Sequence, residues 1–163
     1  MTIHIFTTGG TIDKVYFDAN SEYQVGEPQI HEVLREANVT FDYTIESLMR
    51  KDSLELTDDD RQIIHDAVAN APGQQIIVTH GTDTMAETAR ALADIPDKTI
   101  VLTGALQPAR LRYTDAVFNI GAALTAAQLA PPGVYIAMNG RVFDAHNVRK
   151  NVDVRRFEEL TGD

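Results

Sequence analysis

Two motifs rich in hydroxyl groups stand out in this sequence of 163 residues: Thr8-Gly9-Gly10-Thr11 and His80-Gly81-Thr82-Asp83-Thr84. In the first motif, adjacent glycines allow a sharp turn and a close approach of backbone to a ligand. The threonine that follows them would then project its hydroxyl into a cleft. A hydroxyl is a weak nucleophile until a base or a cation activates it. The pattern therefore fits either an activated nucleophile at Thr11 or a tight turn with a structural threonine.

The second motif combines hydroxyls with a carboxylate. Asp83 would lie just before the N-terminus of a helix, where positive partial charge keeps a carboxylate ionised. An ionised aspartate in a cleft can hold a cation such as a substrate ammonium, and Thr82 could supply a second hydroxyl. The alternative is a helix entry in which Asp83 is itself the N-cap. The pattern alone leaves both interpretations open.

A lysine late in the chain is a further candidate. Lys150 lies in the run Asn147-Val148-Arg149-Lys150-Asn151, and a buried lysine can serve as a base. The alternative is a solvated basic stretch that continues to Arg155-Arg156. The histidines show no metal-ligand spacing such as HExxH, so we expect ordinary surface or hydrogen-bonded side chains. They are His4, His31, His65, His80 and His146.

Composition and charge narrow the classes of function. A net charge of −10 disfavours nucleic acid and anionic membrane as partners. The absence of cysteine excludes disulfides and Cys-ligated metals and suits a cytoplasmic location. The start of the chain lacks the pattern of a signal peptide, and the most apolar helical stretch, 116–130, is too short to span a membrane. We expect one cytoplasmic domain over residues 1–163.

The elements that position these residues alternate between strand and helix. Short apolar, β-branched runs predict strands over 3–8, 40–45, 75–79, 99–103 and 134–138. Apolar residues at helical spacing predict helices over 29–37, 57–71, 84–93 and 116–129. Thr57 with Asp60, and Thr84 with Glu87, have the spacing of capping boxes.

This alternation predicts an α/β fold: a mostly parallel sheet of the flavodoxin or Rossmann type, in three layers with helices on both faces. Ligands of such sheets bind beyond the carboxyl ends of the strands, near the point where strand order reverses. Hydroxyls, glycines and one carboxylate follow the first four predicted strands and should meet at that edge. They lie in the segments 8–11, 52–53, 80–84 and 103–105.

Taken together, the two motifs resemble the two signatures of the bacterial-type asparaginase family. Thr8-Gly9-Gly10-Thr11-Ile12 is similar to the first signature, and the run from His80 to Thr88 is similar to the second. They occur in the family's order, and each follows a predicted strand. Weaker similarity covers nearly the whole chain, including 22–26, 103–105 with Pro108, and the segment around Lys150.

The resemblance implies a catalytic role for five residues. Thr11 matches the family's nucleophilic threonine on a mobile loop, and Tyr23 matches the tyrosine that assists it. Thr82, Asp83 and Lys150 match a second triad. In that triad the lysine lowers the cost of deprotonating a hydroxyl or water, and the aspartate also holds the substrate's α-amino group.

The resemblance also implies the substrate subsites and the reaction. Ser53 matches a serine that binds the substrate's α-carboxylate, and Gly10 and Gly81 would line the site with Thr82 and Asp83. The implied reaction is hydrolysis of L-asparagine to L-aspartate and ammonia through a β-aspartyl ester. It requires no metal or organic cofactor. A homo-oligomer, a dimer or higher, is expected by resemblance.

The chain also departs from the family. Typical members are longer and carry a smaller second domain, which contributes an acidic residue to a neighbouring subunit's site. The expectation is therefore a natural short form or a truncated chain. Leu54 stands where many long members have a polar residue, and Asp13 stands where a small residue is common.

Four alternative functions stay open at this point. Two are related hydrolases: a glutaminase-asparaginase of broader amide specificity and an asparaginase-like transamidase subunit. The third is a non-catalytic module that binds aspartate or asparagine. The fourth is a flavodoxin-like domain that binds a flavin or a phosphoryl group, which rests on fold analogy alone.

Overall fold

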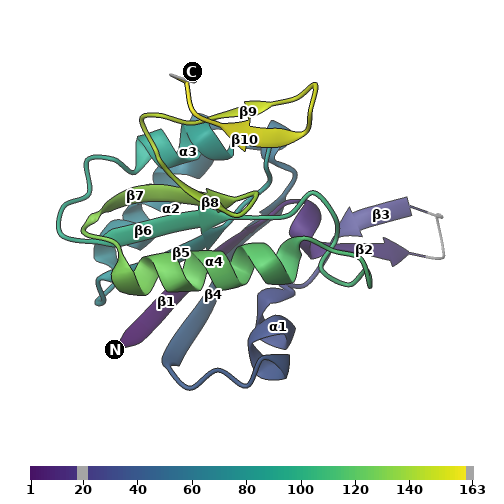
Figure 1. Cartoon of the computed structure of the whole chain (residues 1–163), viewed down its shortest axis with the longest axis horizontal. Coiled ribbons are helices and arrows are strands. Elements are labelled where there is room, and N and C mark those ends of the chain that lie inside the picture. The colour runs from purple at the N-terminus through teal and green to yellow at the C-terminus, as the bar shows by residue number, and fades with distance from the viewer. Residues whose placement is uncertain (18–21, 161–163) are drawn as a thin grey trace.

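The computed structural model describes residues 1–17 and 22–160, and its centre is a six-stranded sheet (Figure 1). The strand order is β4-β1-β5-β6-β7-β8, with the first five strands parallel and β8 antiparallel at the edge. The strands are β1 (Thr2–Gly9), β4 (Asp42–Lys51), β5 (Gln75–Thr79), β6 (Thr99–Thr103), β7 (Gly133–Met138) and β8 (Arg141–Asp144). The predicted mostly parallel sheet is confirmed.

Helices cover both faces of this sheet, which confirms the predicted three layers. They are α1 (Ile30–Glu36), α2 (Asp58–Asn70), α3 (Met85–Ala91) and α4 (Ala116–Leu129). Within β5, Ile76 and Val78 point to the core shared with α2 and α3, whereas Ile77 points to the core shared with α1 and α4. The alternation follows from the two-residue period of a strand, so a strand buried on both faces reads as one apolar run.

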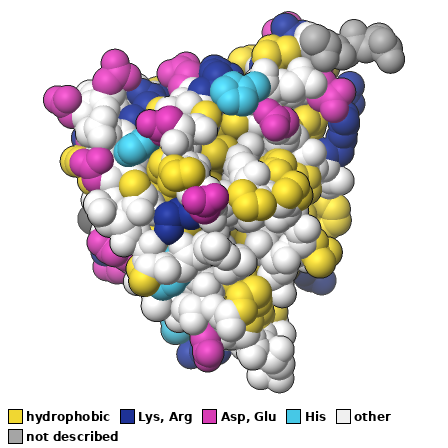
Figure 2. Space-filling view, turned by 90° about the vertical axis from the view of Figure 1, so that its left-hand side faces the viewer, with side chains coloured by type: hydrophobic (Ala, Val, Ile, Leu, Met, Phe, Trp, Pro, Cys, Tyr) yellow, Lys and Arg dark blue, Asp and Glu magenta, His cyan; other side chains and the backbone are white. Residues whose placement is uncertain are grey.

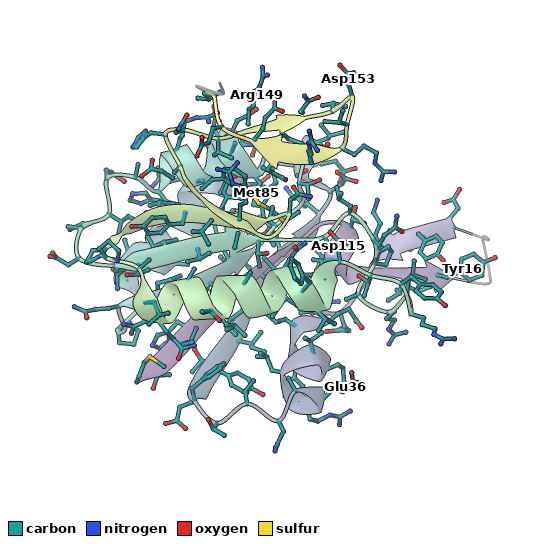
Figure 3. The ribbon with its side chains drawn as sticks, in the orientation of Figure 1. Tyr16, Glu36, Met85, Asp115, Arg149 and Asp153 are labelled. Atoms are coloured by element: carbon teal, nitrogen blue, oxygen red, sulfur yellow. The ribbon has the colours of Figure 1, made fainter. Side chains whose placement is uncertain are left out.

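Two small hairpins lie outside the main sheet. One pairs β2 (Lys14–Phe17) with β3 (Glu22–Val25), and the other pairs β9 (Arg149–Asn151) with β10 (Arg156–Glu158). The first projects beyond the sheet and carries Tyr16, whereas the second carries Arg149 (Figure 3). Their residues are mostly polar or exposed, so no apolar run marked them as strands.

Two sequence predictions differ from the structure by more than one or two residues at the end of an element. The strand predicted over 40–45 begins at Asp42 and continues to Lys51, because it pairs with β1 from Asp42 to Ser47 and again, after a register shift, at Lys51. The capping box predicted at Thr84 is wrong: Thr84 is the N-cap of α3, but its hydroxyl donates to the Ser53 carbonyl oxygen at 2.8 Å. The capping box of Thr57 with Asp60 is confirmed at the start of α2.

The strand order reverses at β1. The chain leaves β1 for β4 on one side and returns in β5 on the other, so the carboxyl ends of β1 and β5 lie side by side. At the opposite end of the sheet, acidic, basic and hydrophobic side chains are interspersed (Figure 2). Among the described helices, none combines the length and the apolar character that crossing a membrane requires.

Candidate functional site

The loops after β1 and β5 touch through two glycines. Gly10 has φ +87°, and a Cβ built on it would lie 2.5 Å from the Cα of Gly81. A Cβ on Gly81 would in turn lie 2.6 Å from the Cβ of Ser53, which follows β4. Only glycine fits at such spacings. The structure therefore brings together the loops that follow three neighbouring strands.

Thr11 stands directly after this glycine contact. It begins the short 3-10 helix η1 (Thr11–Asp13), and its side chain is half-buried without a hydrogen-bond partner among the residues described. The turn is held by backbone bonds: Asp13 N donates to Gly10 O at 3.1 Å, and Ala109 N donates to Ile12 O at 3.0 Å. Gly10 touches Gly81, and Thr11 and Thr82 are the residues that come directly after these two glycines in the sequence. The contact therefore brings the backbones of the two threonines close together.

Lys150 reaches the second motif from the β9–β10 hairpin. Its Nζ donates to Thr82 Oγ1 at 2.8 Å and to Asp83 Oδ1 at 2.7 Å, and its side chain is only 14% exposed. Backbone pairing with Phe157 of β10, a buried residue of the core, fixes the position of the lysine. The lysine is therefore not part of a solvated basic run. It forms one cluster with a hydroxyl and a carboxylate 68 and 67 residues away in the sequence.

Ser53 supplies a buried hydroxyl beside the glycine contact. The residue is 1% exposed, and its Oγ has no hydrogen-bond partner within the described part of the chain. It lies in the 3-10 helix η2 (Ser53–Glu55), which Asp52 caps by accepting from Leu54 N. A buried polar atom without a partner is uncommon in folded proteins, so this hydroxyl needs an explanation beyond the packing of the fold.

Asp13 connects the loop of Thr11 to the segment that contains Gly26 and Gln29. Its carboxylate is buried and accepts from Gln29 N at 2.9 Å, while its own carbonyl accepts from Gly26 N at 2.9 Å. Burial raises the pKa of Asp13 from 3.8 to about 7, and the Gln29 bond and the positive charge of Arg50 oppose this rise. The sequence marked Asp13 as unusual but did not reveal this clamp, since its partners lie outside the two motifs.

Tyr23 is the one candidate that the structure does not bring to the cluster. It lies on β3 opposite Tyr16, with ring centroids 5.5 Å apart, and about half of it is exposed. Its hydroxyl has no hydrogen-bond partner in 1–17 and 22–160. Its assisting role stays a prediction. The same described segments contain no group of three or more acidic or histidine side chains arranged to hold a metal ion.

The fold and this geometry define a class of protein: an α/β domain with a cluster of hydroxyls, a lysine and a carboxylate at the switch point of its sheet. The chain belongs to the asparaginase family. The family model described as "Asparaginase, N-terminal" matches residues 2–158.

Individual relatives agree with this assignment. A glutaminase-asparaginase of Acinetobacter glutaminasificans is 32% identical over 136 residues, which cover 78% of this chain and 39% of that protein. A probable periplasmic L-asparaginase of Haemophilus influenzae is 32% identical over 161 residues, which cover 91% and 46%. The solved L-asparaginase of Thermococcus kodakarensis superposes with a TM-score of 0.86 at 26% identity, covering 100% of this chain and 52% of that one. This chain thus spans about half of these relatives, or less.

Proposed function

We propose that this chain carries asparaginase catalytic machinery and hydrolyses the side-chain amide of L-asparagine to L-aspartate and ammonia. One observation carries the proposal: Lys150 Nζ bonds both the Thr82 hydroxyl and the Asp83 carboxylate, at 2.8 and 2.7 Å. A cation on a threonine hydroxyl stabilises the negative charge that develops when that hydroxyl or a nearby water loses a proton. Family membership supports the same reaction.

The binding step uses the charges and the free hydroxyl of the site. The substrate ammonium would pair with Asp83, whose second carboxylate oxygen makes no hydrogen bond to Lys150 in the described structure. The substrate α-carboxylate would lie against the unpartnered Ser53 hydroxyl. The glycine backbones of Gly10 and Gly81 leave room for close approach of the amino acid.

The chemical steps then follow from the two threonines. The Thr11 oxygen forms an ester bond to the side-chain carbonyl carbon, the carbon–nitrogen bond breaks, and the hydroxyl proton leaves with the amide nitrogen as ammonia. Water then attacks the ester, and one of its protons returns to the Thr11 oxygen. Lys150 and Thr82 would stabilise the charge on this water as it loses its proton. Tyr23 would assist Thr11.

The deciding experiment measures ammonia release from asparagine and from glutamine, each at millimolar concentration. We expect release from asparagine by the wild type and its loss in Thr11→Ala, with Thr125→Ala as a control on the exposed side of α4. A well-folded wild type that binds aspartate without releasing ammonia would instead support the non-catalytic binding module. Equal rates on both amides would indicate a glutaminase-asparaginase, the activity named for the Acinetobacter relative.

Assembly and location are also proposals. We propose a homo-oligomer, which sedimentation would test. We propose a cytoplasmic location because the chain contains no cysteine, whereas the Haemophilus relative is named as periplasmic. Fractionation of cells that produce the protein would separate the two compartments.

A further inference from the structure

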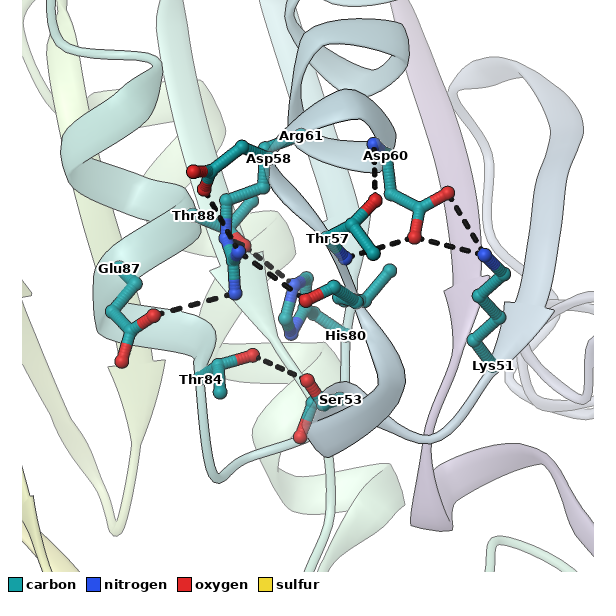
Figure 4. Close-up of polar contacts among 11 residues, drawn as sticks. Lys51, Ser53, Thr57, Asp58, Asp60, Arg61, His80, Thr84, Glu87 and Thr88 are labelled. Carbon is teal, nitrogen blue, oxygen red and sulfur yellow. Dashed lines mark hydrogen bonds and ion pairs between the residues drawn. The ribbon is translucent and has the colours of Figure 1, made fainter.

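A buried chain of hydrogen bonds runs from Arg61 of α2 through Thr88 to His80 (Figure 4) and continues to Gly81 at the glycine contact. His80 is fully buried at the end of β5; its Nδ1 lies 2.6 Å from Gly81 O, and its Nε2 lies 2.8 Å from Thr88 Oγ1. Arg61 Nε donates to the same Thr88 oxygen at 3.1 Å. The histidine therefore has both ring nitrogens engaged.

The donors and acceptors around His80 determine which of its ring nitrogens carries the proton. Gly81 O can only accept, so Nδ1 carries a proton. Thr88 Oγ1 accepts from Arg61, so its own hydrogen is available for Nε2, and the imidazole is neutral with its proton on Nδ1. Burial lowers the pKa of His80 from 6.5 to about 4, and the positive charge of Arg61 also lowers it, against the effect of the Gly81 bond. The ring is thus neutral at pH 7.

The outer end of the chain is anchored on two helices. Arg61 lies on α2 with a side chain only 10% exposed, and it pairs with Asp58 at 3.5 Å and with Glu87 of α3 at 3.4 Å. Its Nη1 also donates to Leu56 O at 3.4 Å. The guanidinium is therefore held from several directions and cannot turn away from Thr88 without breaking these contacts.

At the inner end of these hydrogen bonds, His80 bonds the carbonyl of Gly81, which belongs to the peptide that joins Gly81 to Thr82. Because this peptide is trans, fixing the Gly81 carbonyl also fixes the Thr82 N–H in the opposite direction. Gly81 is already confined between Gly10 and Ser53. The peptide therefore has one orientation, and that orientation sets where the Thr82 hydroxyl meets Lys150.

We propose that Arg61, Thr88 and His80 are positioning residues for the candidate active site, which they serve by holding the Gly81–Thr82 peptide in place. None of the three is a catalytic residue in this proposal. It rests on the proposed asparaginase function, because a displaced Thr82 would lose its alignment with Lys150 and slow the chemical step. Small errors of placement in an active site have large effects on rate.

The test substitutes Thr88, the residue in the middle of this chain of hydrogen bonds. Thr88→Val keeps the shape of the side chain but removes the hydroxyl, whereas Thr88→Ser restores it. The matched control is Thr99→Val, which removes another buried hydroxyl at the far end of the sheet, where Thr99 donates to Ala130 O at 3.1 Å. All three variants and the wild type are compared in kcat and KM for asparagine, in Tm and in the ¹⁵N spectrum of the His80 ring.

We expect Thr88→Val to lose about tenfold or more in kcat, with Thr88→Ser within about threefold of the wild type. Thr99→Val should lose a similar amount of stability but keep its kcat within about twofold. The wild-type His80 spectrum should show a proton on Nδ1 and no titration between pH 5 and 8. A kcat for Thr88→Val within about twofold of the wild type, or a proton on Nε2, would overturn the inference.

A second measurement separates this proposal from the proposed reaction. If the wild type releases no ammonia, the asparaginase proposal fails, and the amide resonances of Gly81 and Thr82 decide on positioning alone. Their movement in Thr88→Val but not in Thr99→Val would support the positioning chain. Unmoved resonances would refute it.

Discussion

Gly10 and Gly81 meet backbone to backbone: a methyl group on Gly10 would lie 2.5 Å from the Cα of Gly81. The contact joins the loop of the candidate nucleophile to the loop of the candidate triad. We predict that Gly10→Ala forces these loops apart, because the added carbon meets backbone and the φ of +87° disfavours any side chain. The expected results are a loss of several degrees in Tm and about tenfold or more in activity.

Gly121 offers the matched control with the opposite sign. It lies mid-helix in α4, and a Cβ there meets nothing within 4 Å. Gly121→Ala should therefore stabilise the protein by about 0.5–1 kcal/mol and raise Tm by roughly 1–4 °C. Thermal unfolding of both variants checks the pair. If Gly10→Ala has the Tm and the activity of the wild type, the contact between Gly10 and Gly81 is not required for stability or for activity.

Lys150→Met should abolish most of the activity. Methionine retains much of the stem but removes the charge from between Thr82 and Asp83, so activity should fall by about 100-fold or more. Lys98→Met is the control, since Lys98 lies just before β6, where its Nζ donates to Ala71 O and Gly73 O at 2.6 Å. Ammonia release from both variants, after circular dichroism confirms folding, tests the role. Comparable losses in the two variants would contradict it.

Asp13 should make the protein less stable as pH rises toward neutrality. The carboxyl has a pKa of about 7 in the folded chain and an ordinary value of 3.8, so the folded state binds the extra proton between these values. The resulting stability is full below pH 3.8 and is lost as pH rises through about 7. Within that window the free energy of unfolding falls by up to about 1.4 kcal/mol per pH unit.

Denaturant unfolding of Asp13→Asn at pH 4.5, 5.5, 6.5 and 7.5 isolates this effect. The asparagine can still accept from Gln29 but does not titrate, so the variant should gain stability relative to the wild type as pH rises. The exposed Asp42→Asn should show no such trend. If the difference in free energy of unfolding between the wild type and Asp13→Asn does not vary with pH, the Asp13 carboxyl does not titrate in this range.

His80 shifts stability in the opposite direction. Its pKa is lowered to about 4 in the folded chain from 6.5, so its contribution is present above pH 6.5 and is lost as pH falls through about 4. Between these values the two buried groups oppose each other. The wild type should therefore show a flatter pH–stability curve than Asp13→Asn, in which only the histidine slope is left.

Thr84→Val should weaken substrate binding more than turnover. The Thr84 hydroxyl donates to the Ser53 carbonyl at 2.8 Å and fixes the residue that would bind the substrate carboxylate. Loss of one hydrogen bond of about 1 kcal/mol predicts a rise in KM of about fivefold. Thr57→Ala removes a true helix cap instead, which should cost about 1 kcal/mol of stability with KM unchanged. Steady-state kinetics and thermal unfolding distinguish the two threonines.

The sequence predicted most of the fold because its strands are buried on both faces. The β5 and β6 bounds match the predicted ones, and α4 does as well, since uninterrupted apolar runs leave few choices. The hairpins were missed for the opposite reason. The β9 and β10 strands read Arg-Lys-Asn and Arg-Phe-Glu, and only their pairing across a turn makes them strands.

The candidate site was predictable in its motifs but not in its contacts. The two glycine-containing motifs indicated which loops would form the site. No local pattern placed Lys150 beside Thr82, and only the resemblance to the family predicted that Lys150, Thr82 and Asp83 act together. The positioning chain was hidden as well, because Arg61, Thr88 and His80 join through tertiary contacts between α2, α3 and β5. The Thr84 prediction failed since a tertiary acceptor on Ser53 competes with the local cap.

The β9–β10 hairpin has a consequence for synthesis of the chain. Asp83 is translated 67 residues before the lysine that neutralises it, which corresponds to roughly 3–13 s at about 5–20 residues per second. During that interval β6 and β7, the last two parallel strands of the sheet, are translated, while Asp83 still lacks its cation. All five parallel strands are therefore translated before Lys150, and the contacts of Lys150 with Thr82 and Asp83 can form only after the strands of the parallel sheet have been made.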